Sequence, residues 1–243
     1  MKNSLGTALI TGGAKRIGRE IALNLAKMGY DLVISYNNSF KEAEEVSSFI
    51  KNELGKKCDL FKCDLSDINQ TKELALQLKN NFPNWNLLIN NASIFRKSRF
   101  LQESSEELFD NLNIHLISPL ILAKEFAARE KENCQIINFL DKDIVNYKTS
   151  YFYYLLSKKS LAELTKMLAI ELAPKVRVNA IAPGFIINSV GQKDPETETQ
   201  NLITKIPLKT KGDIINIWQS VEFLINNKFI NGQIIFVDGG ASL

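Results

Sequence analysis

The chain has 243 residues, of which 45% are hydrophobic and 23% are charged, and its formal net charge is +3. This length suits one α/β domain with a sizeable core, and this composition is ordinary for a globular protein in water. The charge is dispersed without a basic stripe, so we expect no nucleic-acid partner. The sequence shows neither a secretory signal nor an apolar run long enough for a membrane span, which predicts a cytoplasmic protein.

Cysteine and histidine usage narrows the possible chemistry. Cys58, Cys63 and Cys134 are odd in number and form no C-x-x-C pair, which predicts free thiols in a reducing compartment. His115 is the only histidine. A histidine-rich metal site and a Ser-His-Asp triad are therefore disfavoured, and we expect no metal.

Short apolar segments alternate with longer amphipathic ones along the whole chain. Continuous apolar centres are typical of parallel strands covered on both faces, and β-α-β repeats indicate a doubly wound sheet. We therefore predict a single α/β domain over residues 1–243. The predicted strands are 7–11, 31–36, 86–92, 134–140, 176–183 and 233–240, with 59–65 as a weaker candidate.

Two other segments stand out in this alternation. A helix is predicted over 16–29, because Ile17, Ile21 and Leu25 recur at helical spacing. The stretch 184–212 has no clear strand, and long irregular segments in compact domains are usually functional. It follows a strand end, so we predict a lid over the ligand crevice. The lid side chains expected to face the substrate are Phe185, Ile187, Val190 and Leu202.

The segment TGGAKRIG (11–18) lies between the first predicted strand and this helix. Gly12 and Gly13 allow a tight turn, and Gly18 allows close packing at the start of the helix. The helix N-terminus offers free N–H groups to a pyrophosphate. A glycine-rich turn without a ligand is the alternative, but the flanking strand and helix favour a dinucleotide site.

Cofactor selectivity depends on the end of the second predicted strand. NAD-binding loops usually carry Asp or Glu there. This chain has Asn37, Asn38 and Ser39 instead, and Lys15 or Arg16 supplies positive charge nearby. The pattern predicts NADPH. The alternative for Arg16 is that its side chain only reaches solvent.

The segment SYFYYLLSKKS (150–160) holds a candidate acid–base pair. Tyr154 and Lys158 are its only tyrosine and lysine at i, i+4 spacing, which places them on one helix face. A phenol with a pKa near 10 is a sluggish acid at neutral pH. We expect the Lys158 ammonium to lower the pKa of Tyr154 toward the working range.

These motifs, with CDL (63–65), NNAS (90–93), APG (182–184) and VDGG (237–240), resemble the short-chain dehydrogenase/reductase family over the whole chain. The resemblance implies a Rossmann-type domain with a seven-stranded parallel sheet flanked by helices. It also implies a homotetramer that uses helices around 104–130 and 154–173, although packing on their own sheet explains their amphipathicity equally well.

One position departs from the family pattern. The usual serine lies thirteen residues before the tyrosine, and Asp141 stands there. With T-G-x-x-x-R-x-G and N-N-A-S, this is similar to pteridine reductases and dihydromonapterin reductases. By that resemblance Arg16 reaches the cofactor phosphates and the pterin.

The chemistry of a carboxylate at this position agrees with the resemblance. Carbonyl reduction needs a neutral hydroxyl donor, whereas an anionic Asp141 repels the oxyanion that develops on a ketone. Reduction of a C=N bond leaves charge on nitrogen, which must receive a proton, and Asp141 is placed to relay that proton through Tyr154. The alternative is that Asp141 caps a loop.

Two further residues carry expectations from the same resemblance. Phe95 is expected to stack on the pterin, with a core phenylalanine as the alternative. His115 falls near a position where many members carry a catalytic asparagine, and a buried structural histidine is the alternative.

The sequence therefore predicts an NADPH-dependent reductase of dihydropterins such as dihydromonapterin, dihydrobiopterin or dihydrofolate. The alternatives are a 3-oxoacyl-carrier-protein reductase or another carbonyl reductase, and a non-catalytic NADPH-sensing regulator. The predicted catalytic residues are Asp141, Tyr154 and Lys158. The predicted cofactor-binding residues are Gly12, Lys15, Arg16, Ile17, Gly18, Tyr36, Asn37, Asn38, Ser39, Asp64, Leu65, Asn91, Ala92, Ser93, Lys158, Pro183 and Gly184. The predicted substrate-binding residues are Arg16, Ser93, Phe95, Asp141, Tyr154 and Phe185.

Overall fold

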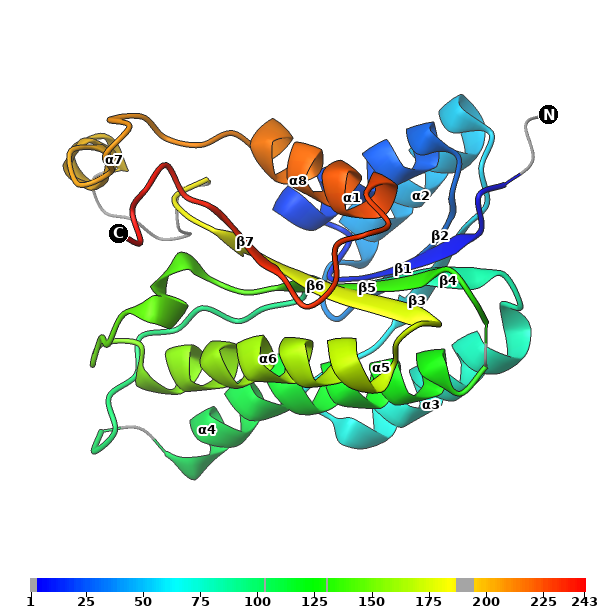
Figure 1. The fold of residues 1–243 in the computed structure, drawn as a ribbon, viewed down its shortest axis with the longest axis horizontal. Helices are drawn as coiled ribbons and strands as arrows, with labels where there is room; N and C mark the ends of the chain where they lie inside the picture. Colours follow the sequence, from blue (N-terminus) through cyan, green and yellow to red (C-terminus); the bar gives the residue numbers. More distant parts are fainter. Residues whose placement is uncertain (1–3, 103, 130, 187–194) are drawn as a thin grey trace.

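A computed structural model describes residues 4–102, 104–129, 131–186 and 195–243. Seven parallel strands form one sheet in the order β3-β2-β1-β4-β5-β6-β7 (Figure 1). The strands are β1 (Thr7–Thr11), β2 (Asp31–Tyr36), β3 (Cys58–Lys62), β4 (Trp85–Asn90), β5 (Cys134–Phe139), β6 (Val176–Pro183) and β7 (Ile234–Val237). The strand order reverses between β1 and β4, which is where open α/β sheets place their ligand crevice.

Helices cover both faces of the sheet (Figure 1). On one face lie α1 (Arg16–Met28), α2 (Phe40–Leu54) and α8 (Ile214–Asn226), and on the other lie α3 (Ile68–Asn81), α5 (Ser118–Ala127) and α6 (Phe152–Glu171). The shorter α4 (Ser105–Leu112) precedes α5, and α7 (Pro195–Ile203) lies beyond the carboxyl ends of the strands, at the left of the figure. The predicted fold class, a doubly wound Rossmann-type sheet, is confirmed.

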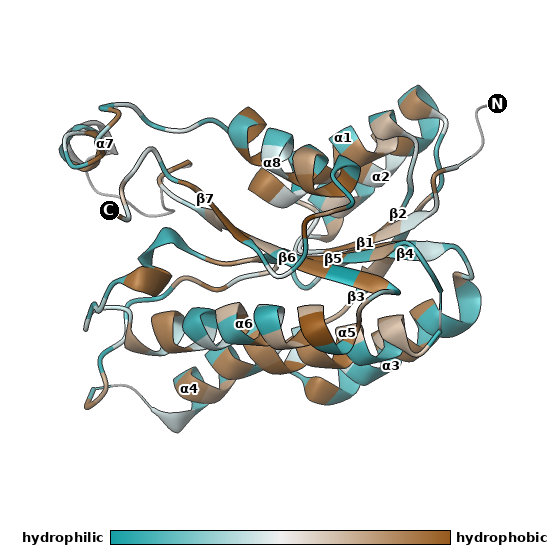
Figure 2. Ribbon diagram, in the orientation of Figure 1, coloured by the Kyte–Doolittle hydropathy of each residue, from teal (hydrophilic) through white to brown (hydrophobic). Residues whose placement is uncertain are grey.

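Hydrophobic burial on both sides of the sheet explains why the apolar runs form strands. Ile10 and Ile34 pack toward α1 and α8, whereas Leu9 and Leu88 pack toward α3 and α5, and all four are fully buried. Figure 2 shows predominantly apolar strands between helices that carry apolar and polar residues side by side. Among the described residues, no helix is both long and apolar enough to cross a membrane.

The predicted strand positions are confirmed, with ends that differ by up to three residues. The weak candidate 59–65 is a strand that begins and ends earlier, at Cys58–Lys62. The three cysteines are free thiols, as predicted, and the structure shows that all three are buried. Burial raises the pKa of Cys58 and of Cys63 to about 11, so both thiols stay protonated at neutral pH.

Two regions differ from the predicted elements. The expected long helix around 104–130 is interrupted by a π-helical turn (Asn113–Ile117) that contains His115. Such turns occur frequently at functional sites. The stretch 184–212 contains α7, and its predicted lid residues Ile187 and Val190 lie outside the described residues.

Candidate active site

The carboxyl ends of β1, β4, β5 and β6 bring the sequence motifs to one edge of the sheet. The turn after β1 holds the glycines, and the loop after β4 holds Ser93 and Phe95. Asp141 follows β5, and Gly184 follows β6. The parallel register therefore gathers residues that are far apart in the sequence into a single candidate site.

The glycine turn fits a bound nucleotide. Gly12 has φ +65°, a conformation that favours glycine, and a Cβ on Gly18 would collide with the Gly12 carbonyl oxygen. At the other side of the crevice, a Cβ on Gly184 would lie 2.6 Å from the Asp238 Cα. The helix α1 begins beside the glycine turn, and its N-cap residue Lys15 makes no side-chain capping bond. A helix N-terminus of this kind suits an anion such as a pyrophosphate.

Hydrogen bonds to β4 hold this turn in place. The Thr11 hydroxyl accepts from the backbone N–H groups of Asn91 (3.0 Å) and Ala92 (3.1 Å). The Asn91 side-chain amide donates to the carbonyl oxygens of Thr11 (2.9 Å) and Gly12 (3.1 Å). Asn91 therefore shapes the cradle by holding its backbone.

The region beyond β2 has its own polar network. Lys15 forms a half-exposed ion pair with Glu42 at 2.6 Å. Asp64 accepts from the backbone N–H and the hydroxyl of Ser66, and these bonds with one from Asn37 outweigh desolvation and lower the pKa of Asp64. Leu65 is buried. Lys15, one of the residues predicted to bind the cofactor, is thus paired with a carboxylate.

Asp141 and Tyr154 are in direct contact. The Tyr154 hydroxyl donates to Asp141 Oδ2 at 2.9 Å. The other carboxylate oxygen accepts from the Asp143 backbone N–H at 2.7 Å and starts a 3-10 turn (Lys142–Val145). The structure therefore unites both interpretations of Asp141, because one oxygen caps a turn while the other binds the phenol.

Lys158 lies beneath the phenol. It is buried, and its ammonium donates to the Phe139 carbonyl oxygen at 2.6 Å, 5.9 Å from the centre of the Tyr154 ring. Burial lowers the pKa of Lys158 to about 8.

The expected lowering of the Tyr154 pKa by Lys158 is wrong for this structure. Burial raises the pKa of Tyr154 well above its usual value, and the charge of Asp141 raises it further. A phenol with a raised pKa stays protonated at neutral pH, so Tyr154 is held as a proton donor.

An aromatic wall borders Tyr154. Phe95 is 51% exposed, so it is not a core residue. Its ring stacks on Tyr151 with centroids 4.5 Å apart and an interplanar angle of 11°, and its edge contacts Tyr154 at 4.9 Å. Tyr151 was not predicted as a site residue, because nothing in the sequence distinguishes it from the neighbouring tyrosines. Phe185 lies after β6, with the Lys211 ammonium 5.4 Å from its ring centre.

His115 is buried behind this wall. Its Nε2 lies 2.9 Å from the Ser93 hydroxyl, and its Nδ1 lies 2.8 Å from the Ser157 hydroxyl. Burial, aided by the charge of Lys158, lowers the pKa of His115 well below its usual value. The imidazole is therefore neutral. Ser157 was not predicted from the sequence, because it contacts a residue 42 positions away in the chain.

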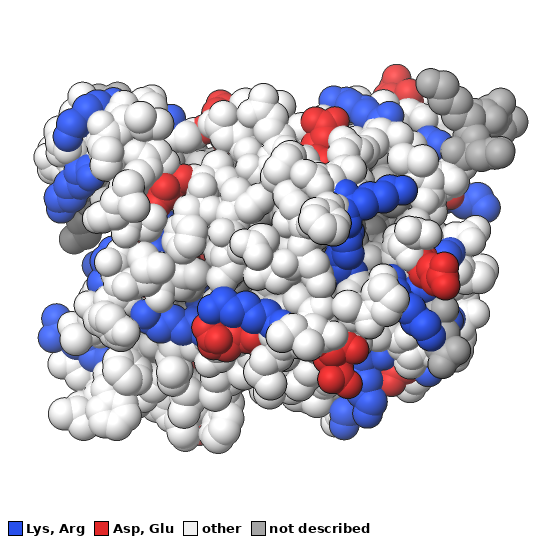
Figure 3. Space-filling view, in the orientation of Figure 1, with Lys and Arg blue, Asp and Glu red and all other residues white. Residues whose placement is uncertain are grey.

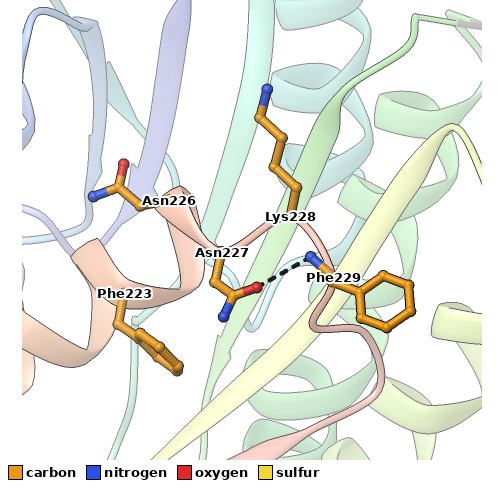
Figure 4. A pocket seen from close by; sticks show the side chains of 5 residues that line it. All are labelled: Phe223, Asn226, Asn227, Lys228 and Phe229. Atoms are coloured by element: carbon orange, nitrogen blue, oxygen red, sulfur yellow. Dashed lines mark hydrogen bonds between the residues drawn. The ribbon is translucent and has the colours of Figure 1, made fainter.

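A hollow away from this site differs from it in character. A shallow hollow is lined by Phe223, Asn226, Asn227, Lys228 and Phe229 at the end of α8, where the amino ends of the strands lie (Figure 4). The Lys228 side chain points away from both phenyl rings, so the hollow gathers no converging polar groups. On the face drawn in Figure 3, basic and acidic residues are interspersed.

The fold and the site together define a class of protein. Seven parallel strands in this order, with a glycine turn between β1 and α1, define a dinucleotide-binding fold. A buried lysine and a hydrogen-bonded tyrosine lie beside the end of β5. A family model described as "Enoyl-(Acyl carrier protein) reductase" matches residues 12–242. The chain belongs to the short-chain dehydrogenase/reductase family of oxidoreductases.

Individual relatives carry several different activities in their names. A 3-oxoacyl-[acyl-carrier-protein] reductase of Staphylococcus aureus (strain Mu50) is 30% identical, with 96% of this chain and 97% of the relative covered. Carbonyl reductase family member 4 of Xenopus laevis is also 30% identical, with the same coverage of both chains. The solved structure of FolM alternative dihydrofolate reductase 1 from Brucella canis, complexed with NADP, is 31% identical with a TM-score of 0.91 over 98% of this chain and 94% of that one.

Proposed function

We propose that this protein is an NADPH-dependent reductase of dihydropterins. The observation that carries the proposal is the 2.9 Å hydrogen bond from the Tyr154 hydroxyl to Asp141 Oδ2. A carboxylate at this position suits a substrate in which the hydride adds to a carbon and the adjoining nitrogen must be protonated. The proposal includes dihydrofolate as a substrate, because FolM is named an alternative dihydrofolate reductase.

NADPH is the cofactor that the chain's own residues fit. The turn from Gly12 to Gly18 offers N–H groups and space to a pyrophosphate, and the end of β2 lacks a carboxylate that would repel a 2′-phosphate. The similar FolM structure was solved with NADP. When bound, NADPH supplies a hydride to the carbon of the substrate's C=N bond.

The protein supplies the matching proton. Tyr154 is a neutral phenol whose raised pKa keeps its hydrogen until a basic nitrogen lies beside it. After Tyr154 gives that hydrogen to the substrate nitrogen, Asp141 is in place to pass a replacement from solvent, since it is only half-buried and bonded to the phenol. Positioned acid–base groups of this kind contribute roughly 10²–10⁴-fold to the rate.

The aromatic wall supports a flat substrate. Phe95 and Tyr151 are already parallel, so the pair is a rigid surface against which a bicyclic ring lies flat. Offset stacking of this type contributes about 0.5–1.5 kcal/mol beyond area burial. Lining by aromatic side chains with a few fixed polar groups is typical of small-molecule sites.

A second candidate function is reduction of 3-oxoacyl thioesters, favoured by the Staphylococcus aureus relative. The oxyanion that develops on the ketone of a 3-oxoacyl thioester needs a neutral hydrogen-bond donor. At position 141 this chain has a carboxylate instead, which already accepts two hydrogen bonds. A regulator without turnover has no need for the Asp141–Tyr154 contact. We therefore favour the dihydropterin reductase.

The experiment measures NADPH consumption with dihydromonapterin, dihydrobiopterin, dihydrofolate and an acetoacetyl thioester. We expect turnover of the dihydropterins and about a hundredfold loss of kcat in Asp141→Ala. Asp143→Ala is the matched control, because Asp143 pairs with Lys142 and Lys148 and does not bond the phenol through its side chain. Thioester turnover without dihydropterin turnover contradicts the proposal, and so does a fully active Asp141→Ala.

A further inference from the structure

His115 has a hydrogen-bond partner at each ring nitrogen. On one side, Nε2 accepts from the Ile94 backbone N–H at 3.2 Å and lies 2.9 Å from the Ser93 hydroxyl. On the other side, Nδ1 lies 2.8 Å from the Ser157 hydroxyl. The imidazole thus connects the loop after β4 to helix α6.

These partners fix the tautomer of the imidazole. The Ser157 hydroxyl donates its only hydrogen to the Tyr154 carbonyl oxygen at 2.8 Å. Ser157 can therefore only accept from His115, so Nδ1 carries the hydrogen. Nε2 is left with a lone pair, which agrees with its acceptance of the Ile94 N–H.

The tautomer in turn orients Ser93. A hydroxyl 2.9 Å from a lone pair must direct its hydrogen at that lone pair, because the opposite arrangement places two lone pairs face to face. The Ser93 side chain is exposed, so its hydroxyl oxygen is accessible to a substrate. The Ile94 carbonyl oxygen is a longer alternative acceptor for this hydrogen, at 3.4 Å, so the shorter contact to His115 holds it and Ser93 presents an acceptor oxygen to the crevice.

We propose that His115 is a positioning residue that makes Ser93 an obligate hydrogen-bond acceptor in the substrate site. This inference rests on the proposed function and extends it to substrate selection. Asp141, which is bonded to the Tyr154 proton donor, and Ser93 then both offer acceptor oxygens to the substrate. A nitrogen heterocycle that carries N–H groups beside its reducible bond satisfies both acceptors, whereas a ketone oxygen meets lone pairs at both.

The tautomer is tested directly on the unmodified protein. His115 is the only histidine, so ¹⁵N-histidine labelling of an untagged chain gives NMR signals from this ring alone. We expect shifts of a neutral ring protonated at Nδ1, unchanged across pH 5 to 8, about where an ordinary imidazole would titrate. A ring protonated at Nε2, or one that titrates in this range, overturns the proposal whatever the substrate is.

The link to Ser93 is tested by a double-mutant cycle. His115→Asn keeps an amide donor near Nδ1 and removes the Nε2 acceptor, and Ser93→Ala removes the acceptor oxygen. We expect each single variant to raise the KM for the dihydropterin about five- to tenfold, and the double variant to match the singles. Melting temperatures report separately on any structural damage.

A matched pair of serines supplies the control. Ser157 and Ser160 both donate to a carbonyl oxygen in α6, but only Ser157 also contacts His115. Ser157→Ala should raise the same KM about threefold, while Ser160→Ala should leave it unchanged. KM effects of His115→Asn and Ser93→Ala that multiply in the double variant overturn the proposal. If the wild type turns over no dihydropterin, the proposed function fails together with the selection role, while the NMR result still decides the tautomer.

Discussion

The two halves of the site hold their polar groups in different ways. In the cofactor half, Thr11 and Asn91 bond to backbone atoms of the glycine turn and of the strand end beside it. In the substrate half, side chains bond to one another, as Tyr154 does with Asp141 and His115 with Ser93. Backbone partners are set by the fold, whereas side-chain partners depend on residue identity. We therefore expect substitutions in the substrate half to abolish turnover while NADPH binding in the cofactor half stays intact.

Tyr154→Phe is expected to separate the two halves of the site most strongly. Removal of the hydroxyl takes away the proton donor and one partner of Asp141, and the backbone cradle is unaffected. We expect kcat to fall about 10³-fold with NADPH affinity within about twofold of wild type. Stopped-flow reduction and fluorescence titration with NADPH measure the two quantities. A variant that loses both in equal measure would show that the halves are not separate.

Lys158→Met tests the buried charge of the substrate half through the pH dependence of folding stability, because the Lys158 ammonium is buried below the phenol. Its folded pKa of about 8 lies below the value near 10.4 of an unfolded chain, so the unfolded chain binds more protons between these values. The Lys158 contribution to stability therefore rises with pH across this window and is constant below it. We therefore expect the free energy of unfolding of Lys158→Met, minus that of the wild type, to fall by about 2–3 kcal/mol between pH 7.5 and 10.

Urea unfolding of both proteins at several pH values measures this difference, and the other titrating groups largely cancel in the subtraction. Because the pKa of Tyr154 is raised on folding, its contribution to the stability of the protein is lost only above about pH 10. This sets the upper pH limit of the measurement. A difference that stays flat with pH would place the Lys158 ammonium in water.

The same division explains what the sequence could predict. The strands, the glycine turn and its helix follow from contiguous patterns, such as the apolar run Thr7–Thr11 before Gly12. Tyr154 and Lys158 share one helix, so their pairing was also predictable. The partners Tyr151 and Ser157 were not, because a stacking contact with Phe95 and a bond to His115 join segments that only the folded sheet brings together. The raised pKa of Tyr154 was missed for a similar reason, since burial of the phenol in the folded chain raises it and the charge of Asp141 raises it further.

Gly18→Ala tests the cofactor half alone. The added Cβ meets the Gly12 carbonyl oxygen, which is backbone and has no room to move without opening the turn. We expect NADPH affinity to fall about thirtyfold, roughly 2 kcal/mol, with kcat at saturating NADPH within about threefold of wild type.

Gly55→Ala is the matched control for that variant. Gly55 ends α2 with φ +61°, and an added Cβ there meets nothing within 4 Å. This change should cost about 1 kcal/mol of stability through the backbone conformation and leave the NADPH affinity unchanged. Equal losses of affinity in both variants would point to general destabilisation.

The smallest expected effect concerns the ion pair beside the glycine turn. Glu42 holds Lys15 at 2.6 Å, and this bond lowers the pKa of Glu42, so the carboxylate is charged at neutral pH. Glu42→Gln removes the anion and releases Lys15 toward a 2′-phosphate, which should tighten NADPH binding about twofold at low salt and leave NADH binding unchanged. Glu20→Gln, which breaks the similar surface pair with Arg19, is the control and should change neither affinity. Tighter binding of both NADPH and NADH would instead indicate a general charge effect. No change in either affinity would mean that Lys15 does not contact the 2′-phosphate, and would assign the preference for NADPH to Arg16, the next residue in the same turn.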